Sequence, residues 1–166
     1  MLEAVNDQEM VEEPVVTEKP RYQFIYTRKH DTGEPDVEML ERNWHLIGPF
    51  CERLGEEMWD QTFETVCENI QSGKFDIWLV AKDKELRACM LGELIPCDNG
   101  KRIYRIHANT GQYIEKWIED IKPVLYDFAR SQRVDRLDMI GRKGYLKPLH
   151  DWVYDRKHVP IYKDVV

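Results

Sequence analysis

The sequence lacks a long hydrophobic run. Its longest apolar stretch, Ile77–Ala81, is far shorter than the roughly 20 residues that a bilayer-spanning helix needs. The opening residues are acidic, and no basic segment precedes an apolar one. We therefore expect no signal peptide and no membrane partner, and we predict a protein of the cytoplasm or of a particle assembled there.

The motifs of several enzyme classes are missing as well. The sequence contains no GxxxxGK[ST] phosphate loop, no HExxH zinc motif and no GxSxG hydrolase motif. Its cysteines form no CxxC pair and complete no zinc set with histidine. We therefore predict no metal site, and four reduced, mostly buried thiols. The cysteines are Cys51, Cys67, Cys89 and Cys97.

Charge is distributed unevenly along the 166 residues, which carry a net charge of -7. Residues 1–20 hold six acids and one base, a net charge of -5, so residues 21–166 carry only -2. The acidic stretch has no apolar periodicity. We predict an acidic N-terminal arm over residues 1–20 and one domain over residues 21–166. A nearly neutral domain makes nucleic acid an unlikely partner.

Hydrophobic periodicity and turn residues predict the elements of this domain. The expected strands are Tyr22–Arg28, Phe75–Lys82, Glu85–Ile95, Arg102–Ala108, Arg136–Gly141 and His158–Val165. The expected helices are Val37–Leu46, ended by Gly48–Pro49, then residues 50–71 as one helix or a broken pair, Gln112–Gln132 and Tyr145–Trp152. Pro123 predicts a kink in the third of these helices, or a division into two.

Two short turns, Asp83–Lys84 and Asp98–Gly100, make the strands that they join antiparallel. The later strand–helix–strand order adds crossover connections. Together these features predict an α/β fold with a mixed, mostly antiparallel central sheet flanked by helices.

Two segments resemble the GNAT superfamily of acyl-CoA N-acyltransferases. One is the hairpin Asp76–Gly92, and the other is Ile140–His150, which is similar to the fifth strand and fourth helix of GNAT-like proteins encoded by short-tailed phages. The resemblance covers roughly residues 21–166. It implies the GNAT fold, and it implies a phage protein among the virion or internal components.

In GNAT enzymes a signature R/Q-x-x-G-x-G/A follows the fourth strand and holds the CoA pyrophosphate at a helix N-terminus. The corresponding stretch here, His107–Ile114, has one glycine and no arginine at the required spacing. Thr110 is a candidate helix N-cap, and Tyr113 stands where the family has a small residue. The residues that the resemblance assigns to the cofactor are Thr110, Gly111, Gln112 and Tyr113.

The resemblance also suggests groups for acid–base chemistry. Many family members place a glutamate on or near the fourth strand and a tyrosine in the fourth helix. The strand here ends in His107, and His150 falls at the tyrosine position. Glu93, on the preceding strand, is a further candidate base. Each of the three has the alternative of a packing or surface residue.

Residues 130–147 are locally basic. Their candidate anion or partner site consists of Arg130, Arg133, Arg142 and Lys143. Such a group can bind CoA phosphates, nucleic acid or an acidic partner, and its alternative is a solvated edge of the domain.

Two functions follow from these residues. The first is a non-catalytic, virion-associated interaction protein with no cofactor, located in the virion or the host cytoplasm. Its partners would be other virion proteins, or copies of itself bound through the acidic arm. The second is an acetyl-CoA-dependent N-acetyltransferase with a divergent pyrophosphate loop.

Overall fold

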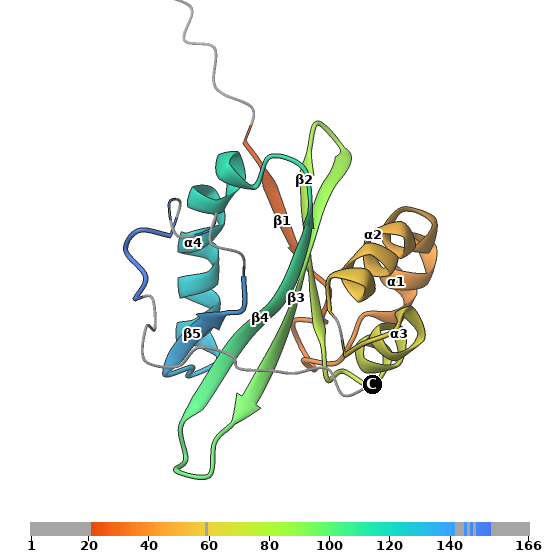
Figure 1. The fold of residues 1–166 in the computed structure, drawn as a ribbon. Coiled ribbons are helices and arrows are strands. Elements are labelled where there is room, and N and C mark those ends of the chain that lie inside the picture. The colour runs from red at the N-terminus through yellow and green to blue at the C-terminus, as the bar shows by residue number, and fades with distance from the viewer. Residues whose placement is uncertain (1–20, 59, 142–144, 146, 148, 154–166) are drawn as a thin grey trace, which may run out of the picture.

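The computed structural model describes residues 21–58, 60–141, 145, 147 and 149–153. Five strands form one sheet in the order β1-β2-β3-β4-β5, and helices cover both of its faces (Figure 1). The elements are β1 (Gln23–Tyr26), α1 (Val37–Arg42), α2 (Trp44–Glu57), α3 (Phe63–Gln71), β2 (Asp76–Lys82), β3 (Glu85–Pro96), β4 (Arg102–Gly111), α4 (Ile114–Ser131) and β5 (Arg136–Met139).

The pairing of the strands confirms the predicted mixed sheet. Strands β1 to β4 are antiparallel neighbours, and β5 runs parallel to β4. The turn between β2 and β3 has positive φ at Asp83 and Lys84, 54° and 63°. Two such residues give the backbone twist that a two-residue hairpin prefers, so the tight turn follows from the local sequence.

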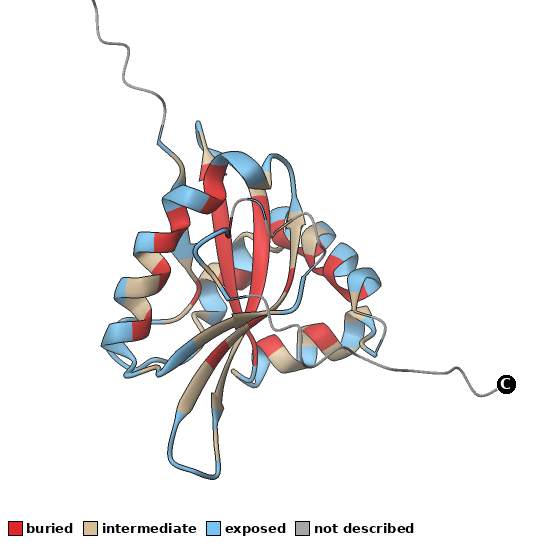
Figure 2. Ribbon diagram, turned by 60° about the vertical axis from the view of Figure 1, so that its left-hand side comes forward, coloured by how far each residue is buried: buried red, intermediate tan, exposed pale blue. Residues whose placement is uncertain are grey.

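The sheet is buried on both faces by two separate cores. Alternate residues of β2 point to opposite sides: Ile77 and Leu79 pack under α1–α3, and Trp78 and Val80 pack under α4. Figure 2 shows the buried residues concentrated in the central strands and on the inward sides of the helices. No helix within the described residues is long and apolar enough to cross a membrane.

The first helical segment differs from the prediction. Helix α1 ends at Arg42, and α2 runs through Gly48 and Pro49, which were expected to end the helix. Gly48 is retained because the Trp44 ring lies over it: a Cβ there would stand 3.2 Å from the indole nitrogen. Ile47, Cys51 and Leu54 of α2 pack in the core under α1–α3, so tertiary packing overrides a local helix-breaking signal.

The later helices resolve two open alternatives. Residues 50–71 are a broken pair, in which α2 ends at Glu57 and Thr62 caps α3 by accepting the Thr65 N–H at 3.2 Å. Helix α4 is one element with Pro123 inside it, so it is not divided into two helices.

The C-terminal predictions are only partly visible. Strand β5 ends at Met139, earlier than expected. The described residues of the expected helix Tyr145–Trp152 adopt turns, with one i→i−4 hydrogen bond from the Leu149 N–H to the Tyr145 carbonyl. The expected strand His158–Val165 and the acidic segment, residues 1–20, lie outside the described residues.

Candidate functional site

The candidate site lies where β4 leaves the sheet and enters α4. Strand β4 contains a bulge four residues before its end: Leu91 pairs with Ala108 and Gly92 pairs with Ile106, which leaves His107 as the extra residue. A bulge bends its strand and redirects the side chain that it carries. The extra residue is thus one of the predicted catalytic candidates.

His107 and Glu93, predicted separately, are brought together. His107 Nε2 lies 2.7 Å from Glu93 Oε2, and the two side chains are only 17% and 20% exposed. The His107 ring lies 5.2 Å from the ring of Phe75, which belongs to the core under α1–α3. The pair therefore faces the α1–α3 side of the sheet. An imidazole hydrogen-bonded to a carboxylate is a pair that enzymes use for general acid–base catalysis.

A second ion pair lies beside the first, and sequence reasoning missed it. Arg105 Nε and Nη2 donate to the two carboxylate oxygens of Asp138, both at 2.9 Å. The hydrogen bonds to Asp138 raise the pKa of Arg105 and outweigh the opposing effect of burial. The signal was the parallel register of β4 and β5, which places these two residues opposite each other.

His150, the third predicted catalytic residue, lies on the other side of the sheet. Its neighbour Leu149 packs in the core under α4. Asp151 accepts a hydrogen bond from Lys122 of α4 at 2.7 Å, and this bond lowers the pKa of Asp151. His150 itself is exposed. The structure therefore does not bring His150 to the His107–Glu93 pair.

The predicted pyrophosphate loop is built differently from the expectation. Thr110 is not a helix cap: it is a strand residue of β4 paired with Cys89. Gly111 packs so closely on β3 that a Cβ would stand 2.5 Å from the Ala88 Cα, which only glycine permits. The Gln112 N–H already donates to the Arg87 carbonyl at 3.1 Å.

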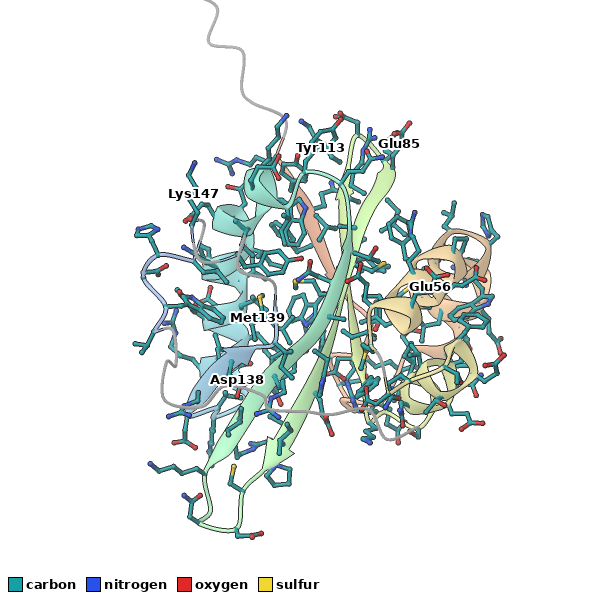
Figure 3. All side chains as sticks on the ribbon, viewed as in Figure 1. Glu56, Glu85, Tyr113, Asp138, Met139 and Lys147 are labelled. Carbon is teal, nitrogen blue, oxygen red and sulfur yellow. The ribbon has the colours of Figure 1, made fainter. Side chains whose placement is uncertain are left out.

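Helix α4 begins without a side-chain cap. Its N-cap residue, Tyr113, has φ 59° and ψ 39°, the left-handed region that a bulky residue rarely adopts. The Tyr113 side chain is half exposed and stacks under Lys116, whose Nζ lies 4.6 Å from the ring centre. Figure 3 places Tyr113 beside Glu85 at one end of the molecule, with Asp138 well away from both.

A hollow of about 120 Å³ remains at this junction. Its lining consists of Glu57, Asn109, Thr110, Gly111, Ile114, Trp117 and Tyr145. Tyr145 Oη donates to Asn109 Oδ1 at 2.7 Å, which links the segment after β5 to the last part of β4. Glu57 contributes the one charged side chain of this described lining, and that charge is negative. The sequence offered no local signal for Glu57, because it is brought here by the packing of α2.

The predicted basic patch is only partly described. Arg130 is exposed and pairs with Asp127 one turn away on α4, and Arg133 is exposed in the turn before β5, with φ 52°. Arg142 and Lys143 lie outside the described residues. Arg130 and Arg133 are at the C-terminal end of α4, so they do not contribute to the hollow at its N-terminal end.

A buried polar network lies under β1 and was also missed. Asp76 is 3% exposed; it pairs with Arg28 and accepts the Tyr26 hydroxyl at 2.9 Å. Burial raises the pKa of Asp76, and the Arg28 charge and the hydrogen bonds oppose that rise. Arg28 also donates to the carbonyls of Gly33 and Gly73, so this network fastens the chain around β1.

Comparisons with known proteins place the fold. No family model and no curated protein matches the sequence. Solved structures do match. A probable acetyltransferase has a TM-score of 0.62 at 9% identity, covering 87% of this chain and 98% of that one. A ribosomal-protein-alanine N-acetyltransferase from Brucella melitensis biovar Abortus 2308 has a TM-score of 0.59 at 12% identity, covering 87% and 100%.

A third similar structure is an aminoglycoside N-acetyltransferase in complex with CoA, with a TM-score of 0.58 at 7% identity, covering 90% of this chain and 99% of that one. The chain has the GNAT fold. Identities this low show the fold alone, because one fold serves many functions. The expected fold is confirmed, and the function has to be argued from the site.

Proposed function

We propose that this chain uses the GNAT fold to bind another macromolecule and does not transfer an acetyl group. The observation that carries the proposal is the small hollow where β4 meets α4, about 120 Å³, whose described lining contains no basic side chain. A GNAT enzyme must hold an anionic pyrophosphate at this place, and unsatisfied amides at a helix N-terminus do so.

Three features of the hollow oppose such a ligand. The described lining has no arginine or lysine to bind phosphate, the side chains that usually do so. The Gln112 amide is already bonded to Arg87. The bond between Tyr145 and Asn109 crosses the lining that the thiol arm of CoA would have to enter. Each feature weakens anion binding independently of the others.

The resemblance of the sequence to GNAT-like proteins of short-tailed phages supports a setting for this binding role. In that setting the chain is a virion-associated component, in the virion or the host cytoplasm. Its partners are other virion proteins or further copies of this chain. A function without a cofactor belongs to the same proposal.

Calorimetric titration of acetyl-CoA into the full chain tests the proposal. We expect no binding up to about 1 mM, the upper end of common KM values. The matched variant combines Glu57→Gln with Tyr145→Ala, which removes the negative charge and the bridge. This variant should bind acetyl-CoA measurably if these groups close the site. Micromolar binding by the unmodified chain would overturn the proposal.

One observation favours a second candidate, an acetyl-CoA-dependent N-acetyltransferase: the His107–Glu93 pair on the bulge of β4. In this reaction His107 takes a proton from the acceptor ammonium, and Glu93 stabilises the imidazolium that forms. The amine nitrogen then attacks the thioester carbonyl, and the intermediate breaks its C–S bond. The nitrogen loses its second proton, which ends on the departing CoA sulfur, so the products are the amide and the CoA thiol.

A CoA-release assay with a panel of primary amines tests this second candidate. If the chain turns over, His107→Ala should lower kcat by about 10²–10⁴, the usual contribution of a general base. The exposed His45 of α2 provides the matched control, because His45→Ala removes a histidine far from the bulge. Equal rates for the three proteins would remove His107 from the mechanism, and no turnover would leave the binding function.

A further inference from the structure

The end of the sheet opposite the candidate site carries a concentration of basic side chains. We call this group the basic end: Lys101, Arg102, Arg133 and Arg136. These residues lie at the start of β4, in the turn after α4 and at the start of β5. A hollow of about 260 Å³, larger than the one at the candidate site, opens among them, and its lining is Cys97, Asn99, Lys101, Ile103, Asp135 and Arg136.

Most of this positive charge is uncompensated. Within the part of the chain that the structure describes, the side chains of Lys101, Arg133 and Arg136 make no hydrogen bond, ion pair or ring contact. Asp135, the acid in the lining, accepts the Arg102 N–H at 2.8 Å. At the other end, Lys116 stacks on Tyr113 and Lys82 stacks on Tyr22, whereas Lys84 is exposed in the β2–β3 turn. Asp135 offsets part of the positive charge of the basic end, which still presents more bases than acids to an anionic ligand.

The chain itself supplies a segment of matching chemistry. The acidic segment, residues 1–20, has a net charge of -5 and contains the stretch Glu9-Met10-Val11-Glu12-Glu13. Two apolar side chains stand there between acids. Ile103 and Cys97 are the apolar side chains of the hollow's lining, and Lys101 and Arg136 are its basic ones. Apolar side chains inside and carboxylates at a cationic rim fit a small polar-rimmed interface.

Arg21, where the acidic segment joins the described chain, and the basic end lie at opposite ends of the sheet. Gln23 of β1 pairs with Ala81, next to the β2–β3 turn, and β4 ends beside β3 at the same level. Helix α4 runs from this end of the sheet to the basic end (Figure 1). Its 18 residues span about 27 Å.

The length of chain between the acidic stretch and Arg21 limits binding within one molecule. Glu13 stands eight residues before Arg21, and eight residues reach at most about 28 Å when fully extended. Binding to the molecule's own basic end would need a nearly stretched tether, which lowers the effective concentration steeply. The basic end of a second copy imposes no such limit.

We propose that residues 9–13 of one copy bind the basic end of another copy. This rests on the proposed binding function and names its partner as a second copy of this chain. Because the two surfaces differ, the contact is head to tail, and repetition gives a ring or an open row of molecules.

Sedimentation velocity of the full chain tests the proposal. We expect association at 0.1 M salt, where the screening length is about 10 Å, and an apparent dissociation constant at least about tenfold higher at 1 M, where it is about 3 Å. Arg133→Glu with Arg136→Glu should abolish association, and so should Glu9→Lys with Glu12→Lys and Glu13→Lys.

The decisive experiment is a mixture of these two variants. Each retains one intact surface, and the two reversed surfaces are complementary in charge to each other, so the mixture should associate although neither variant does so alone. The control reverses two exposed charges elsewhere, Lys84→Glu with Lys147→Glu, and should associate like the unmodified chain.

A monomer at 0.1 M salt would overturn this inference, and so would association that survives both sets of charge reversals. Neither result bears on acetyl-CoA, so the proposed function would stand. Conversely, tight acetyl-CoA binding would overturn the proposed function and leave the association to be judged on its own.

Discussion

Gly92 shows how a single residue sets the shape of the core under α4. A Cβ at this position would lie 2.0 Å from Tyr104 Oη, and Tyr104 is fully buried. The same hydroxyl accepts the Trp78 indole N–H at 2.8 Å. The Tyr104 ring cannot move away from an added Cβ. Such a shift would break the hydrogen bond from Trp78, and the close-packed core leaves no space for it.

We therefore expect Gly92→Ala to lower the free energy of unfolding by about 1–3 kcal/mol, the usual cost of overpacking. Urea denaturation followed by tryptophan fluorescence measures this. Tyr104→Phe alone should also destabilise, since it leaves the Trp78 N–H unpaired. The double variant should lose less than the sum of the two, because both changes disrupt one hydrogen bond. Strict additivity would contradict this account.

Asp76 makes a prediction about pH at the same scale. Burial raises its pKa in the folded protein above the unfolded value, despite Arg28 and Tyr26. The folded state therefore holds this proton more tightly, so the stability contributed by Asp76 is greatest below the unfolded pKa and is lost as pH rises through the folded one.

The substitution Asp76→Asn replaces the titrating carboxyl by a neutral amide, so the variant does not lose stability at this position as pH rises. We expect the stability difference between the two proteins to move in favour of Asp76→Asn from about pH 4 to about pH 7, as measured by thermal unfolding across that range. If Arg28 instead held the pKa of Asp76 below its usual range, the unmodified chain would gain over the variant as pH rises. That opposite slope would refute a raised pKa for Asp76.

At the scale of elements, α4 contains a proline in its interior. Pro123 is exposed and leaves the Glu119 carbonyl without its intrahelical donor. We expect Pro123→Ala to restore that bond without loss of core packing and to stabilise the protein by about 1–3 kcal/mol. This corresponds to a rise in Tm of about 2–4 °C for each kcal/mol.

Differential scanning calorimetry measures the change. Asp120→Ala is the matched control, an exposed substitution one turn earlier on the same helix, and it should stay within about 0.5 kcal/mol. An unchanged Tm for Pro123→Ala would mean that the Glu119 carbonyl already has another donor.

The elements also show what the sequence could predict and why. Helix α4 was predictable because its apolar residues repeat along one face, and the β2–β3 hairpin because its turn and strands are adjacent. The continuation of α2 through Gly48 and Pro49 was not, because it depends on the packing of Ile47, Cys51 and Leu54 in the core under α1–α3. Local signals decide an element only where distant contacts do not oppose them.

The candidate site divides in the same way. The sequence identified His107 and Glu93 as groups capable of acid–base chemistry. Their proximity depends on the bulge in β4, and no turn residue in the sequence predicts that bulge. Glu57 and Tyr145 reach the hollow through contacts between elements far apart in the sequence. Chemistry-bearing residue types are visible in a sequence, whereas the closing of a site by distant side chains is a property of the packed structure.

At the scale of the whole molecule, two cores share one sheet. Leu54 of α2 is fully buried in the core under α1–α3. Leu125 of α4 is 1% exposed, in the core on the other face of the sheet. Strands β2 and β3 contribute side chains to both cores, so neither helical layer can lose its packing while the sheet persists. The described part of the chain should therefore unfold as one cooperative unit.

Leu54→Ala and Leu125→Ala test this coupling from opposite faces. Each should lower the free energy of unfolding by about 2–5 kcal/mol, the usual cost of truncating a buried leucine. Far-UV circular dichroism and tryptophan fluorescence should report the same single transition in both variants. Separate transitions from the two probes in either variant would show that one layer unfolds alone. Coincident transitions would mean that a partner bound at either end of the sheet stabilises the whole molecule, because ligand binding and unfolding are then linked through one equilibrium.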